Sequence, residues 1–249
     1  MPVVTFIVPC LNEAEVLPAT IARVLAAGRA LEESFEVIVV DDGSTDDTWE
    51  QVVSAASRHP EVRGIRFAAN FGQEPALFAG LDQARGDWVL TLDADLQDPP
   101  ELAGEMLQKA RSGYDVVYGM RRSRAGESWF KRSTAWVFHR LLNIVAHHPV
   151  PVDSGNFRLL SRRAVDALLA GPDHRRYLRT LVSELPLPQT GIRFDRDSRA
   201  AGATKYSTAR LFRVAFHALT TSARKPRRSP PDLPPLYRIR ETTPTVPAR

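Results

Sequence analysis

The sequence predicts an α/β fold built around a mostly parallel central sheet. Over the first 120 residues, short apolar runs alternate with segments that have the apolar spacing of helices. The run Phe35 to Val40 is almost continuously apolar, as expected for a parallel strand that is covered on both faces. Repeated strand and helix units of this length imply right-handed crossovers between parallel strands.

The first two strand and helix units are predicted from β-branched runs and helix-capping residues. Val3 to Val8 is a short β-branched run, which we expect to end at Pro9. Glu13 to Ala27 has helical spacing. After the strand Phe35 to Val40, a helix is expected through Ser57, with Ser44, Thr45 and Asp46 as candidate N-caps.

The next three strands follow in the same rhythm. Val62 to Phe67 is the third expected strand, and a helix follows from Glu74 to Ala84. Trp88 to Leu92 is the fourth strand and ends at Asp93. The prolines at 99 and 100 open a helix that reaches residue 112, and Asp115 to Tyr118 gives a fifth strand. The sequence shows no repeat that accompanies this alternation.

Charge divides the chain into two unlike halves. The 33 Lys and Arg against 29 Asp and Glu give a net charge of +4. Residues 1–120 contain 8 basic and 20 acidic residues, a net of −12, and residues 121–249 contain 25 and 9, a net of +16. Such asymmetry predicts that the two halves face different partners.

Composition and motifs exclude several classes of protein. Hydrophobic residues make up 43% of the chain, enough for a packed core, so global disorder is excluded. The single cysteine, Cys10, excludes an internal disulfide framework and a cysteine zinc cluster. The N-terminus lacks a basic segment before its apolar run, and no apolar run is long enough to span a membrane, so neither a signal peptide nor a transmembrane helix is expected. Two glycine motifs that bind phosphate in other proteins are absent: there is no GxxxxGK(S/T), and no GxGxxG follows the first strand.

The sequence changes character after Met120. Trp129 to His147 and Ser207 to Ala223 are basic and amphipathic, and from Arg224 the last 26 residues contain 7 prolines and 7 basic residues. We therefore expect one domain over residues 1–223, with its halves at 1–120 and 121–223. The tail, residues 224–249, is expected to be disordered.

Polar clusters follow three of the expected strands. They are Pro9-Cys10-Leu11-Asn12-Glu13, Asp41-Asp42-Gly43-Ser44, and the run from Asp93 to Glu101, Asp-Ala-Asp-Leu-Gln-Asp-Pro-Pro-Glu. In open parallel sheets, ligands bind beyond the carboxyl ends of the strands, so these clusters converge on one edge. Alternate carboxylates at Asp93 and Asp95 repel each other unless a cation compensates, and oxygen ligands favour Mg²⁺ or Mn²⁺. Such an ion would also bridge a diphosphate, which no glycine loop is present to hold.

These clusters, taken in order, resemble those of family 2 glycosyltransferases of the GT-A fold. The closer resemblance is to polyprenyl-phosphate glycosyltransferases, the group of dolichyl-phosphate mannose synthase and undecaprenyl-phosphate glucosyltransferase. Three further motifs strengthen it: Asn70-Phe71-Gly72, Asp153-Ser154-Gly155-Asn156-Phe157-Arg158-Leu159-Leu160 and Gly202-Ala203-Thr204-Lys205-Tyr206. The resemblance covers roughly residues 3 to 226.

The resemblance implies roles for residues of the acidic half. One of Asp41 or Asp42 would hydrogen-bond the nucleobase; Asp42 is favoured, but the choice stays open. Asp95 and Gln97 would ligate the metal, which neutralises the diphosphate as it leaves. The other expected nucleotide-sugar-binding residues are Pro9, Leu11, Asn12, Glu13, Asp93 and Ala94.

The resemblance also implies which residues meet the phosphates and the reacting centre. The candidate catalytic residues are Asp153, Asp93 and Arg121, and whether Asp153 acts as a base or as an orienting group stays open. The expected cations for donor or acceptor phosphates are Arg121, Arg132, Arg158, Arg199 and Lys205, although an ordinary solvent-exposed role is the alternative for each arginine. Transfer with inversion at the sugar is carried over from the family.

The implied function is transfer of a sugar from a UDP- or GDP-sugar to a polyprenyl phosphate such as undecaprenyl phosphate. Trp129 to His147 would then lie at an anionic membrane surface, and the protein would be peripheral on the cytoplasmic face. Two alternatives stay open: a non-lipid acceptor, and an inactive protein that binds membrane partners. No nucleic-acid motif is present, and the oligomeric state is left open.

Overall fold

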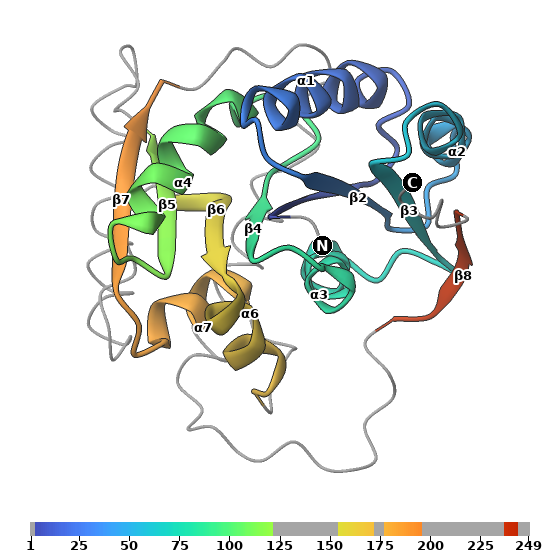
Figure 1. The fold of residues 1–249 in the computed structure, drawn as a ribbon. Coiled ribbons are helices and arrows are strands. Elements are labelled where there is room, and N and C mark those ends of the chain that lie inside the picture. Colours follow the sequence, from blue (N-terminus) through green and yellow to red (C-terminus); the bar gives the residue numbers. More distant parts are fainter. Residues whose placement is uncertain (1–2, 122–153, 172–176, 196–236, 244–249) are drawn as a thin grey trace, which may run out of the picture.

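The computed structural model describes residues 3–121, 154–171, 177–195 and 237–243. They form an eight-stranded sheet with helices on both faces (Figure 1), in the strand order β7-β5-β6-β4-β1-β2-β3-β8. The prediction of an α/β fold with a mostly parallel central sheet is confirmed. Within the described residues, we find no helix with the length and apolar character needed to cross a bilayer.

The acidic half supplies the parallel centre of the sheet. Its four strands are β1 (Val4–Cys10), β2 (Phe35–Asp41), β3 (Val62–Phe67) and β4 (Trp88–Thr91). Strand β1 pairs in parallel with both β2 and β4, and β2 pairs in parallel with β3. The chain thus passes from β1 outward to β3 and returns to the other side of β1 as β4. Such a reversal of strand order is where open α/β sheets bind ligands.

The remaining strands extend the sheet on both sides. They are β5 (Val116–Arg121), β6 (Ser154–Ser161), β7 (Gln189–Phe194) and β8 (Ile239–Thr242). Strand β6 lies between β4 and β5 and is antiparallel to both, while β7 is parallel to β5. Because β6 is antiparallel to β4, the chain enters β6 at the edge where β4 ends.

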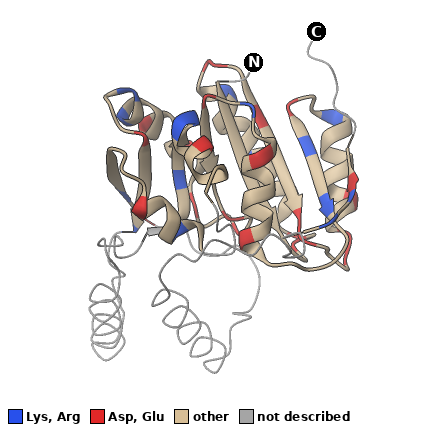
Figure 2. Cartoon of the chain, turned by 90° about the horizontal axis from the view of Figure 1, so that it is seen from below, with Lys and Arg blue, Asp and Glu red and all other residues tan. Residues whose placement is uncertain are grey.

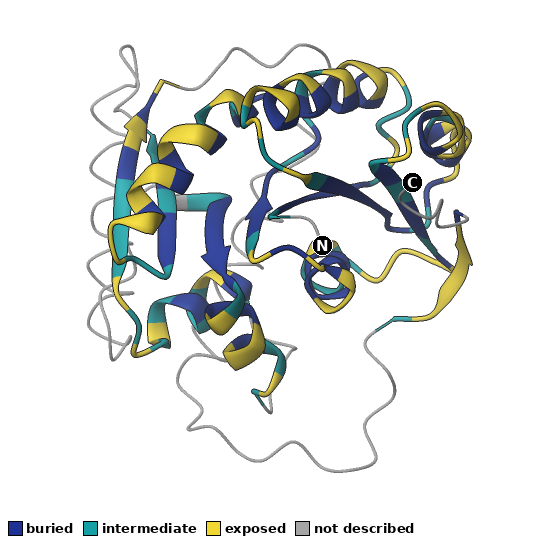
Figure 3. Ribbon diagram, in the orientation of Figure 1, coloured by how far each residue is buried: buried dark blue, intermediate teal, exposed yellow. Residues whose placement is uncertain are grey.

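Helices cover both faces of the sheet, which explains the continuous apolar strands. On one face lie α1 (Leu17–Ala30), α2 (Thr48–Arg58), the 3₁₀ turn η1 (Pro100–Leu102) and α4 (Ala103–Arg111); on the other lie α3 (Gln73–Gln83), α6 (Arg162–Leu169) and α7 (Leu178–Glu184). Each face of the sheet has its own hydrophobic core, and alternate residues of β2 belong to one or the other. Val37 and Val39 lie in the core with α1, and Ile38 and Val40 lie in the core with α3. The buried faces of the helices point toward the sheet (Figure 3).

Two expected boundaries in the first unit were wrong. Strand β1 runs through Pro9, which pairs with Val40 of β2. The carbonyl of Ile7 accepts a hydrogen bond from Leu92 N, so the backbone N–H and C=O groups of odd-numbered residues in β1 point toward β4. Pro9 lies beyond the last residue paired with β4, so its missing N–H costs the sheet no hydrogen bond. Helix α1 starts at Leu17 rather than Glu13, because residues 11–16 form a turn.

Part of the expected disordered tail is ordered, which corrects that expectation for residues 237–243. Strand β8 pairs antiparallel with β3 and covers its outer edge. Tyr237 stacks on Phe67 with ring centroids 4.8 Å apart, and Gly64 N donates to Thr243 Oγ1 at 2.8 Å. An unpaired edge strand is unfavourable, and β3 finds its partner far along the chain. The segments Trp129 to His147 and Ser207 to Ala223 lie outside the described residues.

Candidate active site

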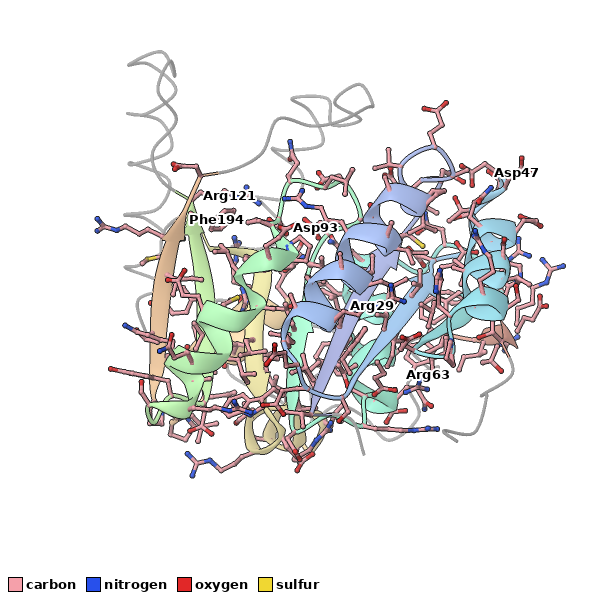
Figure 4. The ribbon with its side chains drawn as sticks, turned by 45° about the horizontal axis from the view of Figure 1, so that its top comes forward. Arg29, Asp47, Arg63, Asp93, Arg121 and Phe194 are labelled. Carbon is pink, nitrogen blue, oxygen red and sulfur yellow. The ribbon has the colours of Figure 1, made fainter. Side chains whose placement is uncertain are left out.

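The three polar clusters of the acidic half meet at one edge of the sheet, as predicted. Cys10 at the end of β1 pairs with Asp41 at the end of β2, and Ile7 of β1 pairs with Thr91 at the end of β4. Figure 4 shows Asp93 and Arg121 at this same edge, on segments that follow β4 and end β5. The carboxyl ends of β1, β2 and β4 therefore place their loops together.

The loop after β1 is fastened to the turn after β2. Asn12 has a φ of 53°, its backbone N donates to Ser44 Oγ at 2.9 Å, and its Oδ1 accepts from Thr45 N at 2.8 Å. Glu13 N donates to Thr48 Oγ1 at 2.9 Å. Left-handed backbone is tolerated at asparagine because its short side chain forms such local hydrogen bonds. The expected nucleoside loop is thus held in one shape by its neighbour.

Asp41 is fully buried and takes part in the internal structure of the turn. Its Oδ1 accepts from Ser44 N at 2.9 Å, and Arg66 Nε lies 3.4 Å from its Oδ2. The Arg66 guanidinium also lies over the Trp49 ring, 5.7 Å from its centroid. Sequence reasoning missed Arg66, although an arginine inside a strand that is expected to be buried is a signal of a buried acidic partner.

Asp42 joins the β2 turn to the loop before α3. Its two carboxylate oxygens accept from Phe71 N at 2.7 Å and Gly72 N at 2.8 Å. Burial raises the pKa of Asp42, and these two hydrogen bonds oppose that rise. Gly43 has a φ of +73°, and a Cβ there would collide with the backbone of Ala69, so only glycine fits this close approach. A contact from Asp41 or Asp42 to a nucleobase stays a prediction.

The segment after β4 places its carboxylates in different surroundings. Asp93 Oδ1 accepts from Gln73 Nε2 at 2.7 Å, and Asp93 N donates to Asp98 Oδ2 at 3.3 Å. Asp95 Oδ1 accepts from Gln97 N at 3.2 Å. Ala94 is buried and its carbonyl accepts from Thr20 of α1 at 2.7 Å, which anchors the segment to the helix.

Asp95 and Gln97 present oxygen atoms of the kind that a hard cation binds. The side-chain carbonyl oxygen of Gln97 is buried and accepts no hydrogen bond from the described residues, which is costly unless another group binds it. Asp95 is partly buried two residues away. Among the described residues, no group of three or more His, Cys, Asp or Glu is placed to hold a metal ion. Asp95 and Gln97 alone are too few ligands for Mg²⁺ or Mn²⁺. They fit such an ion only if phosphate oxygens of a bound substrate complete its coordination.

Arg121 brings a cation to this edge. Its guanidinium lies 3.9 Å from the buried Asp98 and is one quarter exposed. A Cβ added at Gly155 would lie 2.9 Å from Arg121 Nη2, so the start of β6 passes close to the guanidinium. The structure thus brings Arg121 to the edge that carries Asp93, while its action on a phosphate stays a prediction.

Arg158 is buried inside the protein, 2% exposed. Its Nη2 donates to Gly155 O at 2.6 Å. Burial, and after it the charge of the nearby Arg179, lower the pKa of Arg158 to about 10 against the opposing charge of Glu74. Its expected phosphate contact stays a prediction. The remaining expected residues, Asp153, Arg132, Arg199 and Lys205, lie outside the described residues.

A mostly parallel α/β sheet with acidic loops at its switch point, the place beside β1 where the strand order reverses, is the arrangement of a GT-A glycosyltransferase. The family described as Glycosyl transferase family 2 matches residues 5–169. The chain therefore belongs to glycosyl transferase family 2 and is a glycosyltransferase.

Individual relatives support this assignment. The chain is 38% identical over 222 residues to the uncharacterized glycosyltransferase YkcC of Bacillus subtilis, covering 89% of this chain and 69% of that protein. It is 32% identical over 225 residues to the prophage bactoprenol glucosyl transferase homolog of Escherichia coli, covering 90% and 74%. The glucosyl-3-phosphoglycerate synthase of Mycobacterium tuberculosis, solved with Mn²⁺ and UDP, shares the fold at 20% identity, with a TM-score of 0.60 and coverage of 88% and 78%.

Proposed function

We propose that this glycosyltransferase transfers a sugar from a UDP- or GDP-sugar to a polyprenyl phosphate, with a divalent metal and with inversion at the sugar. The observation that carries the proposal is the meeting of the three polar clusters at the switch point of the sheet. The similarity to bactoprenol glucosyl transferases over 90% of the chain supports a lipid-phosphate acceptor.

In this proposal, the acidic half binds the donor. Pro9, Leu11, Asn12 and Glu13 lie on the nucleoside side, where the fastened loop presents a fixed surface. Asp93 and Ala94 follow β4 and face the sugar and diphosphate. A loop that is already held in one shape lowers the entropic cost of aligning the donor.

Asp95 and Gln97 would hold Mg²⁺ or Mn²⁺. The carbonyl oxygen of Gln97, which is buried and finds no hydrogen-bond donor in the described part of the chain, supports this role. When bound, the ion would supply positive charge for the diphosphate leaving group. Arg121 lies at the same edge and would stabilise the same negative charge through its planar guanidinium.

The acceptor side is assigned to the basic half. A phosphomonoester oxygen is already anionic near neutral pH, so its attack depends on alignment more than on deprotonation. Asp153, which directly precedes β6, is proposed to lie nearest the reacting centre, and Arg132, Arg199 and Lys205 to hold phosphates. The basic amphipathic segments would bring the enzyme to an anionic membrane on the cytoplasmic side.

In the test, purified protein and Mn²⁺ are incubated with each member of a panel of four radiolabelled nucleotide sugars: UDP-glucose, UDP-galactose, UDP-N-acetylglucosamine and GDP-mannose. Undecaprenyl phosphate in detergent is the acceptor. We expect label from one donor to enter the organic phase, and EDTA to stop the transfer. No label in the lipid with any donor would overturn the lipid acceptor. Label in a water-soluble product, with glycerol 3-phosphate or 3-phosphoglycerate as acceptor, would favour a non-lipid acceptor instead.

A further inference from the structure

We propose that Gln73 is a positioning residue for Asp93, and that it sets the affinity for the nucleotide sugar through that carboxylate. The inference rests on the proposed function, because it takes the donor to bind beside Asp93. Neither the motifs nor the similarity to known proteins assigns a role to Gln73.

The contact between the two residues is direct. Gln73 Nε2 donates to Asp93 Oδ1 at 2.7 Å, and both side chains are accessible to solvent at least in part. An exposed amide has no need of a carboxylate for its own solvation, so this hydrogen bond does not serve to satisfy a buried group. Its effect is to fix the orientation of the Asp93 carboxylate at the edge where the three polar clusters meet.

Gln73 is itself held in place by another acidic cluster. It is the first residue of α3, and the two residues before it donate their backbone N–H groups to Asp42 at 2.7 and 2.8 Å. Gly72 has a φ of +104°, so the chain enters α3 through a conformation that glycine favours. The start of α3 is thus fastened to the end of β2, and from there Gln73 reaches the end of β4.

The charge of the neighbouring groups explains why a neutral donor suits this position. Asp93, Asp95 and Asp98 follow one another closely in the chain, and a negatively charged side chain at position 73 would add repulsion to the Asp93 carboxylate. An amide instead donates a hydrogen bond and adds no charge. Gln73→Glu therefore removes the donor and adds repulsion, while Gln73→Leu only removes the donor.

The helix provides its own control. Gln83, at the other end of α3, makes the same kind of contact: its Nε2 donates to Asp82 Oδ2 at 3.0 Å, and both residues are exposed. Gln83→Leu removes an amide–carboxylate hydrogen bond from the same helix at the opposite end of the sheet. It should leave donor binding unchanged.

The experiment measures binding of the four nucleotide sugars of the panel by calorimetry with Mn²⁺, first to the wild type and then, with the tightest ligand, to the variants. We expect Gln73→Leu to weaken binding roughly threefold to tenfold, as for loss of one ordinary solvent-accessible hydrogen bond, and Gln73→Glu to weaken it more. In an Asp93→Ala background, which lacks the acceptor, Gln73→Leu should cause little further loss, because Gln73 acts through the Asp93 carboxylate.

Each other outcome counts against a defined claim. If no nucleotide sugar binds the wild type, the proposed function fails and this inference fails with it. If the wild type binds a donor and Gln73→Leu binds it equally well, the inference alone is overturned. An equal loss in Gln83→Leu, or a full additional loss in the Asp93→Ala background, would show that Gln73 acts through helix stability and would overturn the positioning role.

Discussion

Hydrogen bonds between neighbouring loops hold the polar edge of the acidic half, whereas the described part of the basic half contributes mainly strands and helices. Residues 3–121 are described without a gap, and their polar loops are fastened by contacts between neighbouring loops, such as Asn12 with Ser44 and Asp42 with Gly72. Figure 2 colours the Asp and Glu positions red along the ribbon. The proposed donor side therefore lies mainly on loops of the acidic half.

The described part of the basic half nevertheless completes the sheet of the acidic half. Strand β6 covers the edge of β4, and β8 covers the edge of β3. Leu178 N of α7 donates to Glu74 of α3 at 2.7 Å. The acidic half carries the polar loops, while strands and helices from the basic half close both of its exposed edges.

The sharpest test of the acidic half is Asp95→Ala. We expect transfer to fall at least about 1,000-fold, since a bound metal supplies several kcal/mol of charge stabilisation and about 1.4 kcal/mol is tenfold in rate. The measurement is the initial rate of transfer with Mn²⁺, alongside thermal unfolding. Asp166→Ala, which removes an exposed carboxylate of α6, is the control and should keep full activity. Near-normal activity of Asp95→Ala with intact folding would remove Asp95 from the metal site.

A second change tests whether the basic half supports the acidic half. Tyr237→Ala removes the ring that stacks on Phe67, and we expect a loss of about 1 to 2 kcal/mol in the free energy of unfolding. Urea unfolding measures it. Ile239→Ala, whose side chain is 46% exposed on the same segment, should change stability by less than about 0.5 kcal/mol. Equal effects of the two variants would mean that the stacked ring contributes nothing particular.

The smallest expected effect concerns Glu74, where the two halves meet. Burial raises the pKa of Glu74 above its usual value near 4.5, and the hydrogen bond from Leu178 N and the charge of Arg158 oppose that rise. The folded protein therefore holds a proton that the unfolded chain releases, so this contribution to stability is present below pH 4.5 and is lost as the pH rises through the raised pKa.

Glu74→Gln removes this titration and keeps an oxygen for Leu178 N. We expect the stability of the wild type relative to this variant to fall as the pH is raised from about 4 to 7. Urea unfolding at several pH values measures the difference, with Glu105→Gln on the exposed face of α4 as the control. A difference that stays constant with pH, or that rises, would contradict a raised pKa.

Local patterns predicted the elements well and the contacts between them poorly. The strand Val62 to Phe67 is observed with the expected ends, because its apolar residues Val62, Ile65 and Phe67 are spaced as in a strand and lie between two turn segments. Arg66, inside that strand, was missed as a partner of Asp41, since the contact depends on how β3 sits beside β2. Pro9 was expected to end β1, and only the position of β4 explains why it does not.

The sequence by itself determined the α/β class and the order of the acidic loops, because apolar periodicity and turn residues act over a few neighbouring positions. Only the tertiary structure decided the strand order, the covering of β3 by β8, and the contact of Gln73 with Asp93. These depend on pairing between residues far apart in the chain, such as Gly64 and Thr243, 179 positions apart. Such pairing is set by the packing of the whole sheet, which no local pattern records.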